Sequence, residues 1–292
     1  MLTDRPPFTD THVHFHDLRE PELTYSWLQP GAAPDPDLGD YGAIRAERYW
    51  AEDFVAETRF QNVERVVHVQ AAIGTVDPVA ETRWLQAASD RVGVPHGIVA
   101  YADLASPDLA ATLERHMAFP AFRGIRDFRY DDYLTNPAWE VGFALLGKLG
   151  LVCSDDPPVE QADDVRRIAD ANPDTTFCID HAYFPRQRGD AYFSVWREAL
   201  RTVAAAPSTV IKISGLGQCD HRWTVDSLRR WVHACIEEFG IERCFFGTNW
   251  PVDRLFSSYG DVLDAYLELV FDFTPAEQAA LFSGNARRVF GV

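Results

Sequence analysis

Apolar and polar positions follow two alternating patterns along the 292-residue chain. Short runs rich in β-branched and aromatic residues have the length and composition of buried strands. They begin at Phe8, Val63, Pro95, Ala121, Gly150, Thr175, Thr209 and Arg243. Between the later runs, apolar residues recur at helical spacing over residues 77–91, 108–117, 137–148, 159–171, 191–205, 225–239 and 259–271. About eight strand-then-helix units predict a parallel (β/α)8 barrel, the TIM-barrel fold of the α/β class.

An open, doubly wound sheet is the alternative arrangement of these units. Such a sheet would carry a glycine-rich turn after an early strand to hold a nucleotide, and neither GxGxxG nor GxxxxGK[ST] follows one in this sequence. We therefore predict the barrel, formed by residues 1–292 as a single domain, because such barrels often use about 250 residues as one unit.

One connection is too long for an ordinary turn. Residues 16–52 follow the first strand and contain the segment YSWLQPGAAPDPDLGDYG, which is rich in proline, glycine and aspartate. A long loop within a compact domain is usually a lid or a binding loop. We predict a partial lid, with Tyr25 and Trp27 facing a substrate; the alternative is that both rings pack on the barrel rim.

Composition and charge exclude several classes of partner. The formal net charge of −17 argues against nucleic acid, because phosphate binding needs a basic surface. No apolar run reaches the roughly 20 residues of a membrane span, and the first residues lack a signal-peptide pattern. The five cysteines are scattered, as in a reducing compartment. We expect a cytoplasmic protein that acts on a small molecule, and the sequence leaves a homo-oligomer open.

The first strand carries two histidines on one face. In THVHFHD, His12 and His14 alternate with Val13 and Phe15. The apolar pair would pack against the helices of a barrel, so the two imidazoles would point inward. Neighbouring neutral imidazoles form half of a metal site, or a hydrogen-bonding pocket for a polar substrate. His16 lies past the strand end and is expected in the loop.

Later strands end in further reactive side chains. His181 ends the sixth strand, where barrel enzymes place functional residues, and Asp180 is expected on the opposite face. Arg126, on the inward face of the fourth strand, can bind a carboxylate or a lactone carbonyl; a rim ion pair with Asp127 or Asp131 is the alternative. Lys212 and Ser214 share the inward face of the seventh strand, and a mid-strand lysine needs a partner or a ligand because an unpaired buried charge is costly.

The second strand ends in Gln70, whose amide is a candidate for hydrogen bonding to a substrate. His68 lies on the same face of this strand by alternation, and we expect it to contribute packing only.

These residues, in this order, resemble the amidohydrolase superfamily, and most closely its amidohydrolase 2 branch, which holds sugar-acid and pyrone-dicarboxylate lactonases alongside zinc-dependent decarboxylases. The matching pieces are DTHVH (10–14), VHVQ (67–70), GIR (124–126), DH (180–181), VIKISGL (210–216), FGTNWP (246–251) and GNARRVF (284–290). They cover essentially the whole chain, and the ordered set is specific although each piece is short. The resemblance implies hydrolysis of an ester or amide-like bond at the carboxyl end of a distorted (β/α)8 barrel.

The resemblance also implies a zinc site from which this sequence departs. Relatives with zinc hold it by the first-strand histidines, a fifth-strand histidine and an eighth-strand aspartate, which also takes the proton of the attacking water. Here the fifth strand has no histidine, although Asp155 and Asp156 lie at its end, and Asn249 replaces the eighth-strand aspartate. Asparagine is neutral at every useful pH, so it cannot be a general base and is a poor zinc ligand.

The cofactor is left open by these departures. One divalent ion, zinc or manganese, can still be held by His12, His14 and His181, because catalytic zinc needs three protein ligands. We favour catalysis without a metal, in which histidines and cations polarise the carbonyl. The base would then be Asp253, just past Asn249, or else a first-strand histidine.

Taken together, the sequence predicts a hydrolase that attacks a small acidic or sugar-derived lactone with water. The expected catalytic residues are His12, His14, His181, Asn249 and Asp253, and the expected substrate-binding residues are Gln70, Arg126, Lys212, Trp27 and Trp250. Two alternatives are a metal-dependent decarboxylase or hydratase on the same scaffold, and a ligand-binding barrel that has lost its base.

Overall fold

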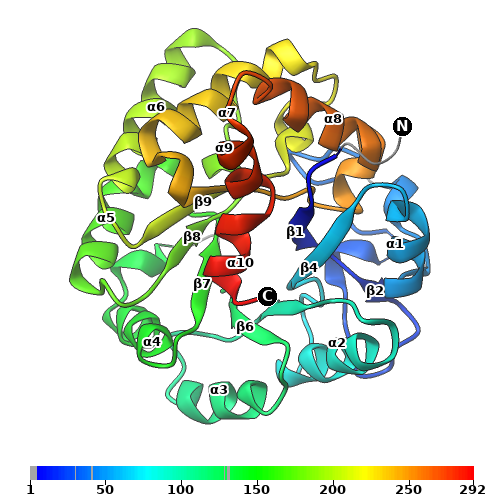
Figure 1. The fold of residues 1–292 in the computed structure, drawn as a ribbon. Helices are drawn as coiled ribbons and strands as arrows, with labels where there is room; N and C mark the ends of the chain where they lie inside the picture. Colours follow the sequence, from blue (N-terminus) through cyan, green and yellow to red (C-terminus); the bar gives the residue numbers. More distant parts are fainter. Residues whose placement is uncertain (1–4, 30, 41, 128, 130–131) are drawn as a thin grey trace.

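Eight strands form one parallel sheet that curves into a barrel in the computed structural model, which describes residues 5–292 except 30, 41, 128, 130 and 131 (Figure 1). The order around the barrel is β1-β4-β5-β6-β7-β8-β9-β10, so each barrel strand pairs with the next barrel strand along the chain. The bounds are β1 Phe8–Val13, β4 Val63–Val69, β5 Gly97–Ala100, β6 Phe122–Ile125, β7 Val152–Asp155, β8 Phe177–Ile179, β9 Thr209–Ile213 and β10 Cys244–Phe246. All eight lie within the predicted runs, which confirms the (β/α)8 barrel.

Helices surround the sheet because each strand is followed by an amphipathic segment (Figure 1). They are α1 Ala51–Thr58, α2 Val79–Val92, α3 Leu109–Met117, α4 Pro137–Lys148, α5 Ala162–Ala171, α6 Asp190–Ala204, α7 Val225–Phe239, α8 Tyr259–Leu269, α9 Pro275–Ala279 and α10 Asn285–Phe290. The predicted helical segments correspond to α2 to α8, whereas α1 begins within the end of the predicted loop. Among the described residues, no helix combines the length and the apolar character needed to cross a membrane.

The barrel closes where β1 meets the segment that follows β10. The backbone N–H of His14 donates to the carbonyl oxygen of Trp250 at 2.7 Å, and the N–H of Trp250 donates to that of His12 at 3.2 Å. Gly247 permits this approach, because a Cβ atom there would lie 2.7 Å from the Oγ1 atom of Thr11. Closure therefore places the first-strand histidines beside the residues that follow β10.

The buried carboxylate of Asp10 ties this seam together. Its Oδ1 atom accepts from the backbone N–H groups of Thr248 (2.9 Å) and His12 (3.3 Å). Its Oδ2 atom accepts from the hydroxyls of Thr248 (2.6 Å) and Tyr259 (2.8 Å). Burial raises the pKa of Asp10 to about 6, against the lowering effect of these hydrogen bonds. The aspartate of the DTHVH motif thus joins β1 to β10.

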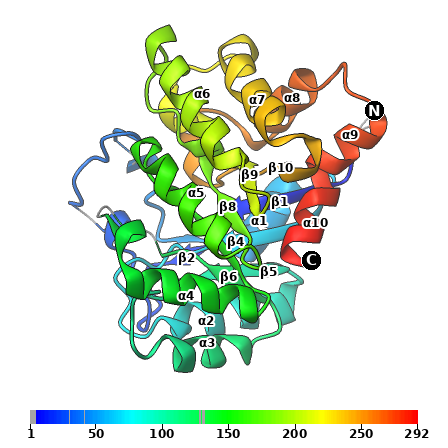
Figure 2. The ribbon, with the colours of Figure 1, turned by 90° about the vertical axis from the view of Figure 1, so that its left-hand side faces the viewer.

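The amino-terminal end of the barrel is covered by α10, which crosses the middle of the barrel in Figure 1 and lies opposite the long loop in Figure 2. Its Phe290 packs edge-on against Phe245, with ring centroids 5.8 Å apart. The Nζ atom of Lys212 lies 5.5 Å from the centre of the Phe290 ring. The layer is completed by Val67, Val69, Val99, Val152, Cys178, Val210 and Ala286.

The long loop is held as a partial lid over the opposite end of the barrel. It begins and ends in the antiparallel pair β2 (His16–Asp17) and β3 (Arg48–Tyr49), and it contains two short 3₁₀ helices, Ser26–Leu28 and Gly42–Ile44. Asp37 fastens it to later loops, because its carboxylate pairs with Arg186 and its carbonyl oxygen faces Nε2 of His221 at 2.7 Å.

We expect Phe290→Ala to lower the free energy of unfolding by about 3–5 kcal/mol, because it empties a buried ring site in the barrel interior. Urea unfolding followed by circular dichroism measures this. Phe271→Ala is the matched control, since that ring is 79% exposed, and it should change stability by less than about 0.5 kcal/mol. Equal effects of the two variants would contradict the role of α10 as a plug.

Candidate active site

A cavity opens at the carboxyl ends of the strands, under the long loop. Its lining comes from the ends of β1, β4, β6 and β8, from the turns after β9 and β10, and from the loop itself. The lining residues are His14, Trp27, Asp35, Leu38, Gln70, Ile73, Arg126, His181, Gln218, Asn249 and Val252. Six of the predicted site residues line it directly: His14, Trp27, Gln70, Arg126, His181 and Asn249.

Three histidines meet at the floor of this cavity, as the sequence predicts. The Nε2 atoms of His12 and His14 are 3.1 Å apart, and the rings of His12 and His181 have centroids 4.4 Å apart. Nδ1 of His14 lies 2.9 Å from the carbonyl oxygen of Val69, which can only accept, so this nitrogen carries the proton. Nδ1 of His181 lies 3.1 Å from the hydroxyl of Ser214.

All three imidazoles are held neutral. Burial, and then the charge of Lys212, lowers the pKa of His12 well below its ordinary value. Burial, and then Arg126, does the same for His14. The pKa of His181 falls to about 3, again through burial, against the raising effect of Asp180. Near neutral pH these rings can accept a proton, donate one hydrogen bond or bind a metal ion without first losing a proton.

His181 reaches the cavity through an unusual backbone turn. By strand alternation it should face the helices, but His181 has a φ of +54° and the three residues after it are also left-handed. Such conformations cost about 1–3 kcal/mol each and persist where the surroundings enforce them. Gly215 makes room for the ring, because a Cβ atom there would lie 2.4 Å from Nδ1 of His181. The glycine of the KISG motif is therefore a steric requirement of the site.

A fully buried ion pair supports the histidines from below. Nζ of Lys212 lies 2.8 Å from Oδ1 of Asp180, donates to the hydroxyl of Ser154 at 3.0 Å and lies 3.4 Å from Nδ1 of His12. Burial alone would raise the pKa of Asp180, but Lys212, His181 and Arg126 outweigh it and lower this pKa. Lys212 thus has a partner, as predicted, but it lies beneath the cavity and does not line it.

The expectation that Asp180 faces away from the site is wrong. Alternation continues from Cys178, which points into the barrel, so Asp180 also points inward. The left-handed turn that follows then brings His181 to the same side. The sequence-based prediction took His181 as the residue whose side chain alternation points inward, and it therefore assigned Asp180 to the wrong face of the strand.

Arg126 is paired at the edge of the cavity. Its Nη2 atom lies 3.0 Å from Oδ1 of Asp156, and both side chains are at least nine-tenths buried. Arg126 therefore forms an ion pair, but its partner is Asp156 and not the expected Asp127, which pairs with Arg129; Asp131 lies outside the described residues. Asp155, its neighbour, turns toward the helix layer, where burial raises its pKa well above the ordinary value.

Asn249 lines the cavity in a left-handed conformation, with a φ of +58°. Its Nδ2 atom donates to Oδ1 of Asp253 at 3.2 Å. Asp253 itself does not line this cavity; the 3₁₀ turn Val252–Leu255 carries it behind Asn249, where it contacts Gly217 and Tyr266 in a narrow space. Burial raises the pKa of Asp253 to about 7, against the lowering effect of Asn249. The side chain of Asn249 therefore separates the Asp253 carboxylate from the cavity.

Trp250 and Tyr25 are not brought to the cavity. After the left-handed Asn249, the Trp250 ring turns outward, packs on Tyr259 with centroids 5.4 Å apart, and donates through Nε1 to Glu57 at 2.9 Å. Tyr25 is fully buried among loop residues.

Two residues that alternation places together are separated in the structure. His68 packs toward α2, but it does more than pack, because its Nε2 atom lies 3.2 Å from Oε1 of Glu81 and its Nδ1 atom accepts from the backbone N–H of Phe15 at 3.1 Å. Gln70 follows the end of β4 and turns into the cavity. Side chains alternate only within a strand, and β4 ends before Gln70. The prediction that His68 and Gln70 share a face is therefore wrong.

The donor chemistry of the histidines fits a divalent metal. Nδ1 of His14 and of His181 have the outer partners described above, and Nδ1 of His12 lies 3.7 Å from Oδ2 of Asp180, an oxygen without a hydrogen-bond partner among the described residues. Such outer partners orient metal-binding histidines. As the side chains stand, no group of three His, Cys, Asp or Glu residues in the described ranges is placed to hold an ion.

Several lining residues were not predicted from the sequence. Asp35, Leu38 and Ile73 come from loops without regular periodicity, and Gln218 lies in the 3₁₀ turn Leu216–Cys219. The only sequence signal for Gln218 is its place just after the KISGL motif. Asp35 lies within the predicted lid, but nothing in its neighbourhood distinguishes it from the other aspartates there.

The amidohydrolase family model matches residues 9–292, and the chain belongs to this family. It is 37% identical to the uncharacterized protein y4mH of Sinorhizobium fredii, over 97% of this chain and 98% of that protein. It is 29% identical to an L-fucono-1,5-lactonase of Burkholderia ambifaria, over 95% and 93% of the two chains. The protein is therefore a hydrolase, as predicted.

The fold is also similar to that of solved structures. An amidohydrolase of Burkholderia multivorans, solved once with bound HEPES and once with bound zinc, matches with a TM-score of 0.83 and 25% identity over 98% of this chain and 99% of that chain. A protein of Pseudomonas putida named as a 2-pyrone-4,6-dicarboxylic acid hydrolase matches with a TM-score of 0.74 over 98% and 97% of the chains. At 19% identity this second likeness shows the fold alone.

The raised pKa of Asp253 makes stability depend on pH. Its folded-state pKa of about 7 lies above the ordinary value of 3.8, so its contribution is complete below about pH 4 and is lost as the pH rises through 7. In Asp253→Asn this loss is absent, so the stability difference, variant minus wild type, should grow by up to about 4 kcal/mol between pH 4 and 8. Urea unfolding across this range measures it, and parallel pH profiles for the two proteins would contradict the shifted pKa.

Proposed function

We propose that the protein hydrolyses a small, neutral, hydroxylated lactone of the kind derived from sugars, by attack of water on the ring carbonyl. The observation that carries the proposal is the polar lining of the cavity. Three amide side chains, Gln70, Gln218 and Asn249, surround a guanidinium and two neutral imidazoles. Amides offer both donors and acceptors, which suits hydroxyl groups. The lactonase relative of Burkholderia ambifaria supports the same class of substrate.

The charges at the cavity favour a neutral substrate over a dicarboxylate. The positive charge of Arg126 is balanced by Asp156 at 3.0 Å. The loop adds the carboxylate of Asp35, whose Oδ1 atom accepts from the backbone N–H groups of Asp37 (2.8 Å) and Leu38 (2.9 Å). A substrate carboxylate near the half-buried Asp35 would be repelled by its like charge. This narrows the expected substrate from acidic or sugar-derived lactones to neutral, sugar-derived ones.

Within this proposal each lining group has a role. Arg126 donates to the lactone carbonyl and stabilises the negative charge that develops on its oxygen. His181, fixed by Ser214, takes a proton from the attacking water. Because its pKa is about 3, it is a weak base, so the site suits a strained and electrophilic lactone better than an amide.

Asn249 would position the attacking water, and Asp253 would position Asn249. Nδ2 of Asn249 donates to Oδ1 of Asp253, which leaves the amide Oδ1 of Asn249 for the cavity. The sequence suggested Asp253 as the base; its place behind Asn249 supports this orienting role instead. Lys212 and Asp180 would hold His12 from below in the same way.

A divalent ion is compatible with this site, and His12, His14 and His181 would hold it. When bound, it would lower the pKa of a water molecule to about 7 and polarise the carbonyl. The zinc-bound amidohydrolase of Burkholderia multivorans supports testing the protein both with and without metal.

The proposal is tested by pH-stat hydrolysis of L-fucono-1,5-lactone and of 2-pyrone-4,6-dicarboxylate by the purified protein, after chelation and after addition of zinc or manganese. We expect hydrolysis of the neutral lactone, with kcat/KM at least tenfold above that for the dicarboxylate. In His181→Asn, kcat should fall by about 10²-fold, the lower end of the usual contribution of a general base, because a pKa of about 3 makes His181 a weak one.

The matched control is His233→Asn, because His233 lies on α7 and faces the carbonyl oxygen of Leu269, away from the cavity. It should leave kcat unchanged. Faster hydrolysis of the dicarboxylate would refute the preference for neutral substrates. Absence of any lactone hydrolysis, with and without metal, would favour a ligand-binding barrel that has lost its base.

A further inference from the structure

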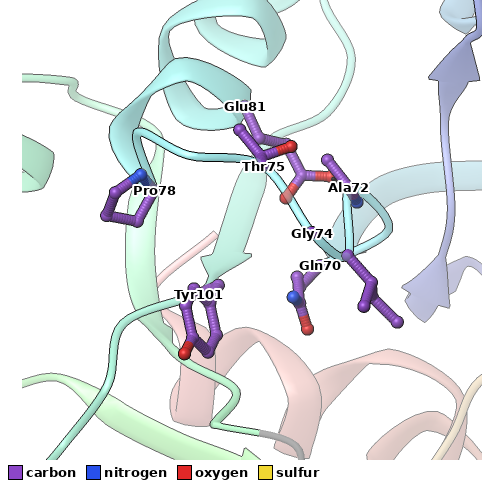
Figure 3. Close-up of a pocket in the computed structure, with 8 residues that line it drawn as sticks. Gln70, Ala72, Gly74, Thr75, Pro78, Glu81 and Tyr101 are labelled. Atoms are coloured by element: carbon purple, nitrogen blue, oxygen red, sulfur yellow. Dashed lines mark hydrogen bonds between the residues drawn. The ribbon is translucent and has the colours of Figure 1, made fainter. Parts of the chain in front are cut away.

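A second cavity, of about 260 Å³, lies beside the active-site cavity and close to the amino end of α2 (Figure 3). Gln70 and Ile73 line both cavities, so their side chains form the wall between them. Glu81 projects into the second cavity from α2, and the ring of Tyr101, which follows β5, lies across from it (Figure 3). The proposed hydrolytic reaction uses Gln70 but neither Glu81 nor Tyr101.

Glu81 presents one satisfied and one open carboxylate oxygen. Oε1 accepts from the backbone N–H groups of Ala71 and Ala72, each at 2.9 Å, and contacts Nε2 of His68 at 3.2 Å. Oε2 has no hydrogen-bond partner among the described residues, and Figure 3 shows the carboxylate directed into the cavity. The first oxygen therefore fixes the side chain, while the second remains available to a ligand.

His68 does not cancel the charge of Glu81. The backbone N–H of Phe15 donates to Nδ1 of His68 at 3.1 Å, so this nitrogen carries no proton. Its Nε2 atom then holds the single ring proton and donates it to Glu81, as a neutral imidazole does. No lysine or arginine in the described ranges pairs with Glu81, whose ion-pair contact is this histidine. The Glu81 carboxylate therefore gives the cavity a net negative charge, although only 2% of this residue is exposed.

Gln70 forms part of the wall of this cavity and adds no acceptor to it. The residue is 5% exposed, and its Oε1 atom is buried without a hydrogen-bond partner among the residues described. The carboxylate of Glu81 is therefore the acceptor that the cavity offers to a ligand.

Aromatic and apolar surfaces complete the cavity. The Tyr101 ring forms one wall, and Pro78 and Ile73 form apolar surface next to it. An aromatic face attracts a cation within about 6 Å of its centre. A carboxylate oxygen and an aromatic ring both favour a ligand that is positively charged and carries N–H donors.

We propose that this cavity binds a small primary ammonium group. Its N–H groups would donate to Oε2 of Glu81, and its alkyl part would lie against Tyr101 and Pro78. Anions are repelled by the charge of Glu81, and a neutral alcohol lacks the positive charge that pairs with this carboxylate. The bound ammonium would lie across the wall formed by Gln70 from the substrate cavity.

The test is a titration of the full chain with propylammonium chloride at constant ionic strength, followed by ligand-observed NMR, with propan-1-ol as the neutral probe of equal size. We expect a Kd on the order of 1 mM for propylammonium, the strength of a single small polar group, and at least tenfold weaker binding of the alcohol. In Glu81→Gln the affinity for propylammonium should fall at least tenfold. This variant keeps Oε1 for its three donors and places an amide nitrogen where Oε2 was.

Glu22→Gln is the matched control, because it removes an exposed carboxylate that pairs with Arg83 of the same helix, α2. Its affinity should equal that of the wild type. If Glu81→Gln does not fold, as judged by its melting curve, Tyr101→Leu replaces it and should weaken binding several-fold. The proposal would be overturned if the alcohol and the ammonium ion bound equally well. It would also be overturned if Glu81→Gln, or Tyr101→Leu in its place, bound propylammonium as tightly as the wild type does.

Discussion

A fully buried ion pair between Lys212 and Asp180 stands at the centre of this barrel, and the candidate site is built on it. Neither side chain is exposed, and their charged atoms are 2.8 Å apart. Removing one partner of such a pair typically costs about 3–5 kcal/mol, because the other charge is left buried and alone. The pair separates the apolar plug around Phe290 below from the imidazoles above. Its lysine also lowers the pKa of His12, next to burial itself, which keeps the cavity floor uncharged.

The same residues that close the barrel also position the site. The backbone of His12 and His14 pairs with Trp250, and Asp10 binds Thr248 across the seam. Closure of the barrel therefore makes the first-strand imidazoles and Asn249 neighbours. A shift of the seam would separate the histidines from the amide, so fold stability and site geometry depend on the same hydrogen bonds.

The sequence predicts the barrel, the inward histidines of the first strand and the inward lysine because strand alternation holds while a strand lasts. It fails where the chain leaves the strand. The left-handed His181 turns to the same inward side as Asp180, so the predicted faces of the two residues were inverted. Trp250 turns outward because it follows the left-handed Asn249. The position of Asp253 depends on a 3₁₀ turn, and that of Asp35 on how a long loop folds across the barrel. Neither is encoded in a short periodic pattern.

The central claim is that burial, Lys212 and Arg126 keep the imidazoles of His12, His14 and His181 neutral. The most direct measurement is a pH titration of the histidine ring nitrogens by ¹⁵N NMR in the metal-free protein, with each residue assigned by substitution. The account predicts that all three rings stay neutral from pH 8 down to about 5, while an ordinary exposed histidine titrates near 6.5. Protonation of any of the three near 6.5 in the folded protein would contradict it.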